Sequence, residues 1–305
     1  MTLTIATWNL ENLFLPGTES GPPDQATYDK KLASLVAMIA QIAPDVLAVQ
    51  EVGDEQAFED LLSALGGEWQ ARLSPDADDR GIRVGFLSTL PFDDLERIRA
   101  FPAGTDPVRL EDDGTTTTQM GRGALRVRVA GADLITTHFK SKLLRFAGRF
   151  QPHDEDERAR YAGYALALRA AEAITLRHRA TGLLGAGATV VVLGDLNDEP
   201  QAATTQILLG PPGSEFKTDG FDTPDKGDAQ RLWNLAPMLP EGRAFSRIFN
   251  GRPELIDHIL VSHALAHSLE SADTGTTDLP SISGPRPASD GSDHAPVFAR
   301  FDWPP

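Results

Sequence analysis

The stretch VVLGDLND (residues 191–198) joins an apolar strand to two polar side chains and marks where that strand ends. Its first three residues are typical of a buried strand, and Gly194 breaks the run. Asp195 and Asn197 follow at alternate positions, so in extended geometry both side chains point the same way while Leu196 turns to the core. The stretch predicts a carboxylate and a carboxamide at one strand end, and an Asx turn is the simpler alternative.

Three other apolar runs also end in polar side chains. They end at Asn9, at Glu51 and at His138, and Lys140 and Lys142 follow His138. Each of these residues has an ordinary explanation: a turn residue, a helix cap, a structural histidine or a solvated pair of lysines. Four strand ends that carry metal-binding, proton-transferring or phosphate-binding groups together indicate a functional site.

An Asp-His pair occurs twice towards the end of the chain, in IDHILVS (residues 256–262) and SDHAPVF (residues 292–298). In the first pair, strand alternation sends Asp257 and His258 to opposite sides, so only Asp257 is expected to enter a site. The second pair precedes the last strand, in a loop, where Asp293 and His294 can both enter. We therefore expect Asp257 to pair with His294 rather than with its neighbour.

Strand-like runs joined by short turns alternate with two long helical patterns. The first helical pattern covers residues 28–44 and stops at Pro44, and the second covers about 156–179. Gly131 is expected to form a hairpin turn between two strands. This mixture predicts an α/β fold with mixed sheets.

Polar stretches at residues 111–123, 210–230 and 271–292 are expected to be loops. The last two are long enough to be candidate substrate loops. None of the three divides the chain into self-sufficient halves, so a single domain spanning residues 1–305 is expected.

The composition restricts the class of partner and ligand. The 305 residues include 28 basic and 44 acidic ones, and the net charge of -16 disfavours non-specific binding of polyanions. A metal-filled cleft can still accept one phosphate group. The chain has no cysteine, so a metal must be held by oxygen or imidazole ligands. No signal peptide or membrane-spanning run is seen, which predicts a soluble, cytoplasmic protein. Nothing in the sequence indicates a protein partner or an oligomeric state.

Six segments, in their order and approximate spacing, resemble the endonuclease/exonuclease/phosphatase family: TWNLENLF, VLAVQEV, THFKSK, VVLGDLND, LIDHILVS and SDHAPVFARF. The resemblance covers residues 4–301. It implies a four-layer sandwich of two mixed β-sheets flanked by helices, as in deoxyribonuclease I-like proteins. It also implies a divalent-metal phosphoesterase site at one edge of the sandwich.

The resemblance implies a role for each matching residue. Glu51 resembles the metal-binding carboxylate, with Asn9 and Asp293 beside it, and these oxygen ligands suit Mg²⁺ or Mn²⁺. Asp195 resembles the residue that orients or deprotonates the attacking water. Asn197 resembles the residue that holds this water or a phosphoryl oxygen.

Two histidines complete the set that the resemblance implies. His294 resembles the family's conserved imidazole, with Asp257 as its carboxylate partner, and either a base or a positively charged clamp fits this position. His138 matches the second histidine, which contacts phosphate or assists the leaving oxygen.

Three cationic residues are candidates for substrate binding. Arg80 and Arg122 precede strands and Lys140 follows one, so each is placed to contact a phosphate. For the two arginines, pairing with the many surface carboxylates is an equally good interpretation.

The expected activity is divalent-metal-dependent hydrolysis of a phosphoester, as in a nuclease-like phosphodiesterase in which metal-assisted water attacks phosphorus. One alternative is a small-molecule phosphatase that acts on a sugar, nucleotide or lipid head-group phosphate. The other is a non-catalytic module that binds phosphate or nucleic acid, and it is disfavoured because every family position that can be mapped is filled. Asp198, Glu199 and Pro200 after GDLN count against an inositol polyphosphatase.

Overall fold

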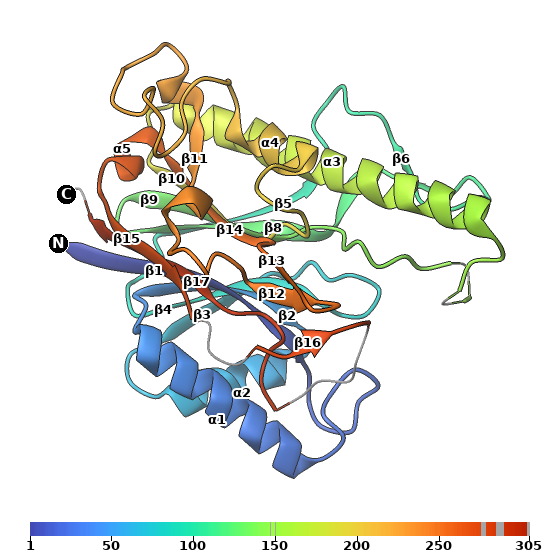
Figure 1. Ribbon diagram of the computed structural model, residues 1–305. Helices are drawn as coiled ribbons and strands as arrows, with labels where there is room; N and C mark the ends of the chain where they lie inside the picture. Colours follow the sequence, from blue (N-terminus) through green and yellow to red (C-terminus); the bar gives the residue numbers. More distant parts are fainter. Residues whose placement is uncertain (147, 150, 276–278, 285–289, 304–305) are drawn as a thin grey trace.

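The computed structural model describes residues 1–303 except 147, 150, 276–278 and 285–289, and its centre is formed by two six-stranded sheets (Figure 1). The first sheet has, in spatial order, β15 (Leu269–Thr274), β17 (Val297–Asp302), β1 (Thr2–Leu13), β2 (Val46–Val52), β4 (Arg83–Ser88) and β3 (Gln70–Leu73). The second sheet has, in spatial order, β11 (Leu232–Asn234), β14 (Asp257–Ser262), β10 (Val190–Asp195), β9 (Ala132–His138), β8 (Gln119–Val129) and β5 (Asp94–Ala100).

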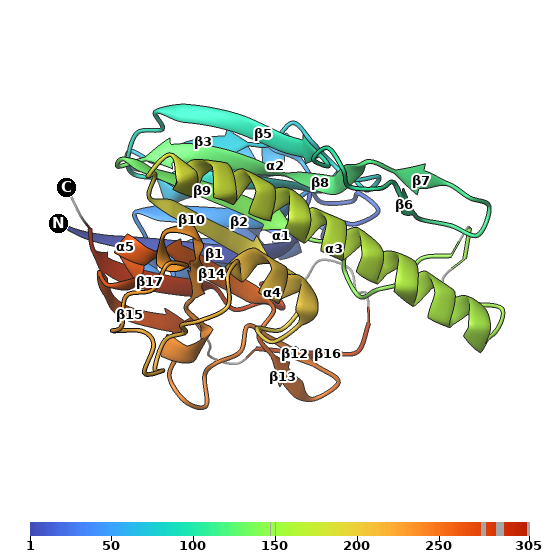
Figure 2. The ribbon, with the colours of Figure 1, turned by 90° about the horizontal axis from the view of Figure 1, so that it is seen from above.

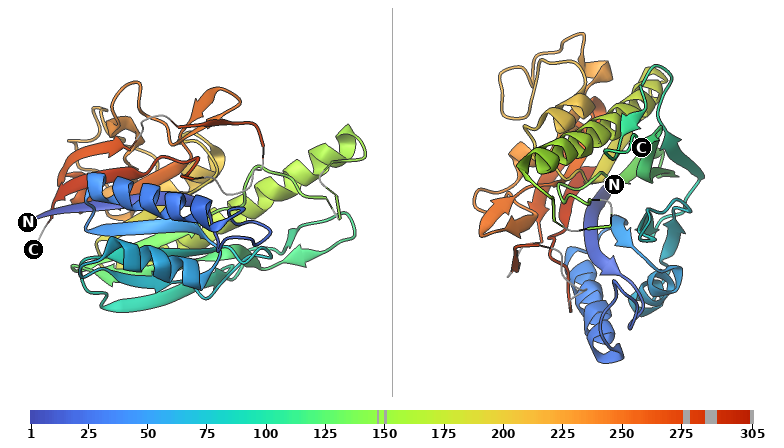
Figure 3. Two further views of the ribbon diagram at one scale, coloured as in Figure 1. Left: turned by 90° about the horizontal axis from the view of Figure 1, so that it is seen from below. Right: turned by 90° about the vertical axis from the view of Figure 1, so that its right-hand side faces the viewer.

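Helices cover both outer faces, so the fold is a four-layer α/β sandwich of two mixed sheets, as predicted (Figures 1 and 3). The first sheet is covered by α1 (Gln25–Ile42) and α2 (Glu55–Leu65), and the second by α3 (Glu155–Gly185) and α4 (Ala203–Leu209). The N-terminal part of α3 extends beyond the sheets (Figure 2). The smaller elements are β6 (Val108–Arg109), β7 (Thr116–Thr117), η1 (Asp228–Gln230), η2 (Ala236–Met238), β12 (Arg247–Phe249), β13 (Arg252–Glu254), α5 (His263–Ala266) and β16 (Ser281–Ile282).

Alternation along the strands separates the inner core from the outer cores. In β1, Leu3 and Ile5 pack between the two sheets, whereas Trp8 and Leu10 pack towards α1 and α2. Period-two alternation in a strand with both faces covered gives a nearly continuous apolar run, which is the pattern of this segment. Within the described residues, no helix is long and apolar enough to cross a membrane.

The strand register brings the polar strand ends to one edge of the sandwich. β9 and β10 are parallel and end together, with His138 opposite Asp195. β14 is antiparallel to β10 and starts there, with Asp257 opposite Asp195. In the other sheet, parallel β1 and β2 pair Asn9 with Gln50. Residues more than a hundred positions apart therefore meet where these strands end or begin.

The element boundaries differ from the sequence expectation in several places. α3 runs to Gly185, beyond the expected end near residue 179, and residues 271–274 of β15 and all of β16 lie within the expected loop at residues 271–292. α1 ends at Ile42 with Ala43 in a left-handed conformation, two residues before the end of the expected pattern at Pro44. The expected loop at residues 111–123 is wrong in its last part, because β8 begins at Gln119 and pairs there with Ala100 of β5. Pairing with a neighbouring strand overrides the polar composition of this stretch.

Gly194 allows β10 to lie close to β9 immediately before Asp195. Its φ is +141°, and a Cβ atom at this position would lie 2.0 Å from the carbonyl oxygen of Thr137. Both the conformation and the close backbone approach require glycine.

We expect Gly194→Ala to lower the free energy of unfolding by at least about 2 kcal/mol, because the strands must separate to admit the methyl group. Gly163→Ala is the control, since Gly163 lies in α3 and a Cβ atom there would have nothing within 4 Å. It should raise the free energy of unfolding by about 0.5–1 kcal/mol. Denaturant titration measures both, and equal stability of the two variants would contradict the assigned role of Gly194.

Candidate active site

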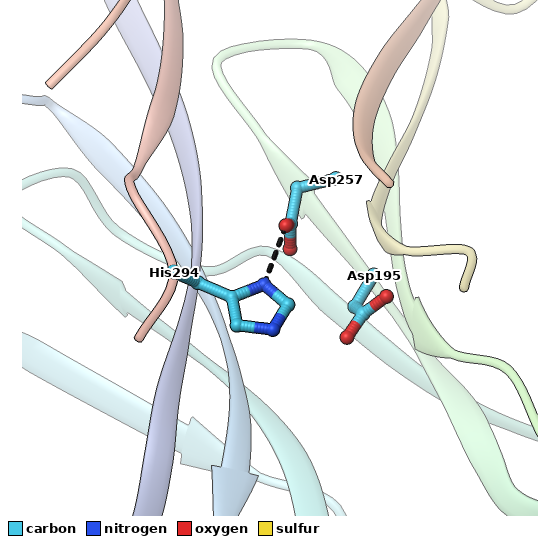
Figure 4. A group of neighbouring side chains, drawn as sticks. All are labelled: Asp195, Asp257 and His294. Atoms are coloured by element: carbon cyan, nitrogen blue, oxygen red, sulfur yellow. Dashed lines mark hydrogen bonds and ion pairs between the residues drawn. The ribbon is translucent and has the colours of Figure 1, made fainter. Parts of the chain in front are cut away.

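A compact group of three buried side chains occupies the sandwich edge (Figure 4). The Nδ1 atom of His294 lies 2.6 Å from Oδ2 of Asp257. One potential ligand atom from each of Asp195, Asp257 and His294 lies within 4.8 Å of the other two. Within the described ranges, this is the one group of three His, Asp or Glu side chains compact enough to share a metal ion.

The electrostatics of this group favour a positively charged imidazole. Burial by itself would lower the pKa of His294, but the charge and hydrogen bond of Asp257 raise it to about 10. Burial raises the pKa of Asp195 to about 7, and the charge of Asp257 acts in the same direction. Asp257 is therefore hydrogen-bonded to the imidazole, whereas Asp195 is a buried carboxyl group that the charge of Asp257 disfavours in its ionised form.

Asp195 is held by groups from both sheets. The side-chain amide of Asn9 in β1 donates to its Oδ2 at 2.9 Å, and the backbone N–H of Asn197 donates to its Oδ1 at 2.9 Å. The Nε2 atom of His138 lies 3.4 Å from the same Oδ2. These contacts fix the orientation of the carboxylate at the end of β10.

His138 lies in the opposite electrostatic environment from His294. Burial, reinforced by the positive charge of Arg122, lowers the pKa of His138 well below its usual value. Among the described residues, its Nδ1 atom has no hydrogen-bond partner. His138 is therefore a neutral imidazole beside a charged one.

Asn197 leaves the strand conformation that alternation predicts. Its φ is +54°, and its N–H closes an Asx turn on Asp195. Its amide nitrogen donates to the carbonyl oxygen of Phe139 at 3.1 Å. Leu196 is buried in the core, as expected. The Asx turn, the simpler of the two interpretations of this stretch, is therefore present, and the extended geometry expected at Asn197 is not.

The two candidate arginines both contact Asp78, Arg80 through its backbone N–H and Arg122 through its guanidinium group. Arg80 donates to the side-chain oxygen of Asn12, whose backbone N–H donates to Oε2 of Glu51 at 2.9 Å. Arg122 forms an ion pair with Asp78 at 3.0 Å and also donates to the carbonyl oxygen of Phe139 at 3.2 Å. Both guanidinium charges act on His138.

The ammonium group of Lys140 is directed to its own loop. Its Nζ donates to the carbonyl oxygens of Ser141 and Leu143 at 3.0 and 2.8 Å. Burial and the charge of Arg122 lower the pKa of Lys140 to about 8. The structure thus does not join Lys140 to the Asp195 group by a hydrogen bond or ion pair.

The three predicted metal ligands are connected through the backbone of β1. Asn9 pairs with Gln50, the residue before Glu51, and the Ser292 hydroxyl donates to the carbonyl oxygen of Asn9 at 2.7 Å, next to Asp293. Glu51 and Asp293 are both partly exposed. Neither belongs to the compact buried group at Asp195, which is built from other residues.

His258 lies on the other side of β14 from Asp257. Its Nε2 lies 2.9 Å from the carbonyl oxygen of Asp198, and its Nδ1 lies 3.2 Å from the amide of Asn234. Asp257 and His294 form the pair at the site, and His258 has a separate, structural set of contacts.

Two residues at this edge, Glu11 and Asn12, were not among the predicted site residues. Both are buried, and their φ values are +48° and +53°. Glu51 and Asn197 are also left-handed, with φ of +62° and +54°. Such backbone costs about 1 kcal/mol or more per residue and clusters at functional sites. In the sequence, the two polar residues that follow Asn9 in NLEN could have indicated that Glu11 and Asn12 also lie at the site.

Several solved structures resemble this chain over almost its whole length. A 3'-5' exonuclease from Neisseria meningitidis matches with 20% identity and a TM-score of 0.58, covering 99% of this chain and 100% of that one. A 3' phosphatase from Neisseria bound to a product DNA hairpin matches with the same values. A mannosyl-6-phosphatase from Bacteroides thetaiotaomicron matches with 14% identity and a TM-score of 0.56, covering 97% of this chain and 98% of that one. At these identities the likeness shows the fold.

No curated protein matches the sequence. The model of one protein family, described as Endonuclease/Exonuclease/phosphatase family, matches residues 6–294. The match spans nearly the whole chain, with β17 beyond its end, and includes the Asp195, Asp257 and His294 group. The chain belongs to the endonuclease/exonuclease/phosphatase family.

Proposed function

We propose that this phosphoester hydrolase is a divalent-metal-dependent phosphodiesterase of the nuclease type, in which water attacks phosphorus. The observation that carries the proposal is the Asp257–His294 pair, with Asp195 facing it at the shared edge of two sheets. One cationic group and one proton acceptor within this distance can act on a single phosphate.

Asp195 is the group that takes a proton from the attacking water. A general base works best when its pKa is near the working pH, and the pKa of Asp195 is about 7. The Asn9 and Asn197 hydrogen bonds hold the carboxylate in one orientation. The Phe139 carbonyl oxygen engages the amide nitrogen of Asn197, which leaves the amide oxygen as the acceptor for the second hydrogen bond of the water.

His294 acts as a charged clamp on the phosphate rather than as a base. Asp257 occupies its Nδ1 and favours the cation, which leaves Nε2–H to donate to a phosphoryl oxygen. The neutral His138, whose Nε2 lies 3.4 Å from Asp195, can donate to a phosphoryl or leaving oxygen. The different pKa shifts thus give the two imidazoles different roles.

Asn9, Glu51 and Asp293 would hold the divalent ion. They offer oxygen atoms only, and two of them are partly exposed carboxylates, which suits Mg²⁺ or Mn²⁺ because these ions keep several waters when bound. The ion would supply neutralisation of the phosphate charge. The Asn12 backbone N–H holds one oxygen of Glu51, so its other oxygen is the one offered to the ion.

A substrate with few contacts beyond the reacting phosphate fits this molecule. Arg80 and Arg122 are close enough to act on His138, yet each already has a protein partner. The net charge of -16 opposes a wide contact with a polyanion. The substrates named for the structural relatives, DNA and a mannosyl phosphate, are the first to assay.

Purified protein with Mg²⁺ or Mn²⁺ should hydrolyse bis-p-nitrophenyl phosphate, and the activity should disappear with EDTA and return when the metal is added back. Release of nitrophenol measures this directly. Inactivity with both metals on this compound, on p-nitrophenyl phosphate, on single- and double-stranded DNA and RNA and on mannose 6-phosphate would refute the proposal.

His294→Ala and Asp195→Asn should each lower kcat by about 10²–10⁴-fold, because one removes the clamp and the other the base. His178→Ala and Asp219→Asn are matched controls at exposed positions. Steady-state kinetics with melting curves would test this, and a loss below tenfold in a folded variant would contradict the role of that residue.

His258→Ala should lower the melting temperature, since a buried imidazole with two partners is lost. Its effect on kcat should be at least about tenfold smaller than that of His294→Ala. Equal kcat losses in the two variants would overturn the assignment of the Asp257 pair.

A further inference from the structure

Two buried charged residues of α3 lie behind the active-site edge. Arg169 and Glu172 are one helical turn apart, so they share a face of the helix, and their exposed fractions are 5% and 1%. Neither belongs to the Asp195 group. Buried charged side chains are costly unless they are well paired, so their contacts are informative.

Glu172 accepts hydrogen bonds from two backbone N–H groups, one in a strand of the second sheet and one in the loop that follows another. Its Oε1 accepts from Gly121 in β8 at 3.1 Å, and its Oε2 accepts from Lys140 just after β9 at 2.7 Å. Arg169 donates to the carbonyl oxygen of Lys140 at 3.0 Å and to Oδ2 of Asp198 at 2.7 Å. The Lys140 residue is therefore held through both its N–H and its C=O from one helix.

Each group that is held in this way is adjacent in sequence to a residue of the site. Gly121 precedes Arg122, and Asp198 follows Asn197. Lys140 follows Phe139, whose carbonyl oxygen accepts from both the Arg122 guanidinium and the Asn197 amide. The helix thus fixes three chain segments that meet at one carbonyl group.

We propose that Arg169 and Glu172 are positioning residues that set the placement of Arg122, the Phe139 carbonyl and the Asn197 carboxamide without touching the substrate. The proposal rests on the proposed function for its catalytic consequence only. The orientation of the Asn197 amide depends on the Phe139 carbonyl, and that carbonyl is held by the Lys140 contacts. A displacement of about 1 Å at such a point is enough to cost about 10²-fold in rate.

The chemistry of Glu172 makes the conservative variant informative. Both carboxylate oxygens accept hydrogen bonds from N–H groups, whereas a glutamine offers one acceptor and one NH₂ group. Glu172→Gln therefore sets a donor against either the Gly121 or the Lys140 N–H while keeping the side-chain volume. Arg169→Lys keeps the charge but cannot reach both of its partners with the same geometry.

The same helix provides a matched control pair. Arg158 and Glu155 are also three residues apart and form an ion pair, but both are exposed. Arg158→Lys and Glu155→Gln make the same chemical changes on α3 without any backbone partner at the site.

We expect Glu172→Gln and Arg169→Lys each to lower kcat on bis-p-nitrophenyl phosphate by about 10- to 100-fold with KM within about twofold, while the control variants keep wild-type values. Assays are run below the melting temperature of every variant. A lowered melting temperature with unchanged kcat would show a merely structural role and overturn the proposal. If either Glu172→Gln or Arg169→Lys does not fold, the kcat of the other variant tests the proposal.

Hydrogen exchange without substrate tests the Glu172 hydrogen bonds to Gly121 and Lys140 independently of the reaction. In Glu172→Gln the amides of Gly121 and Lys140 should exchange at least about tenfold faster than in the wild type, with no change in the control variants. Unchanged exchange at both amides would overturn the proposal even if kcat fell. An inactive wild type would refute the proposed function, and hydrogen exchange would still show whether Glu172 holds the two backbone amides.

Discussion

The hydrogen bond from the Asn9 amide to the Asp195 carboxylate is the contact on which the site depends, because it joins β1 of the first sheet to the end of β10 in the second. A second polar link lies deeper. The Gln50 amide of the first sheet donates to the Thr136 hydroxyl of the second at 3.1 Å, and both side chains are fully buried. Polar groups in an apolar interface are stable when they are paired, and paired groups fix the relative position of the layers more strictly than aliphatic contacts do. The geometry of the site therefore follows from the packing of the whole sandwich.

The environment divides chemically similar side chains into different roles. His294 and His138 are both buried, and burial disfavours the charged form of each. The neighbouring Asp257 carboxylate reverses this effect for His294, whereas Arg122 strengthens it for His138. The pKa values of the two imidazoles consequently shift in opposite directions within one site. Residue type and order in the sequence identify the histidines, but their charge states are set by partners that only the fold supplies.

Local patterns in the sequence predicted an α/β fold with mixed sheets, whereas the four-layer sandwich followed from the resemblance to a known family. Period-two alternation separated Asp257 from His258, whereas the expected break at Gly194 is absent, because β10 continues through it to Asp195. The strand order of the two sheets, the left-handed turn at Asn197 and the α3 contacts of Arg169 and Glu172 were not accessible. Each of these depends on hydrogen bonds between distant segments. The sequence of a helix also does not distinguish a buried Arg or Glu from an exposed one. The start of β8 was missed for the same reason, since its partner strand decides it.

The inter-sheet hydrogen bond also links ligand binding to the integrity of the fold. A phosphate or ion that contacts Asn9 and Asp195 together would bridge the two halves of the sandwich, and any opening of the sheets would have to release it. Binding would then be coupled to the global unfolding equilibrium and not only to local order, since a ligand favours whichever state holds it. In such a molecule a bound ligand would hold the two sheets together. The sandwich edge that gives access to the substrate would then be stabilised by the substrate itself.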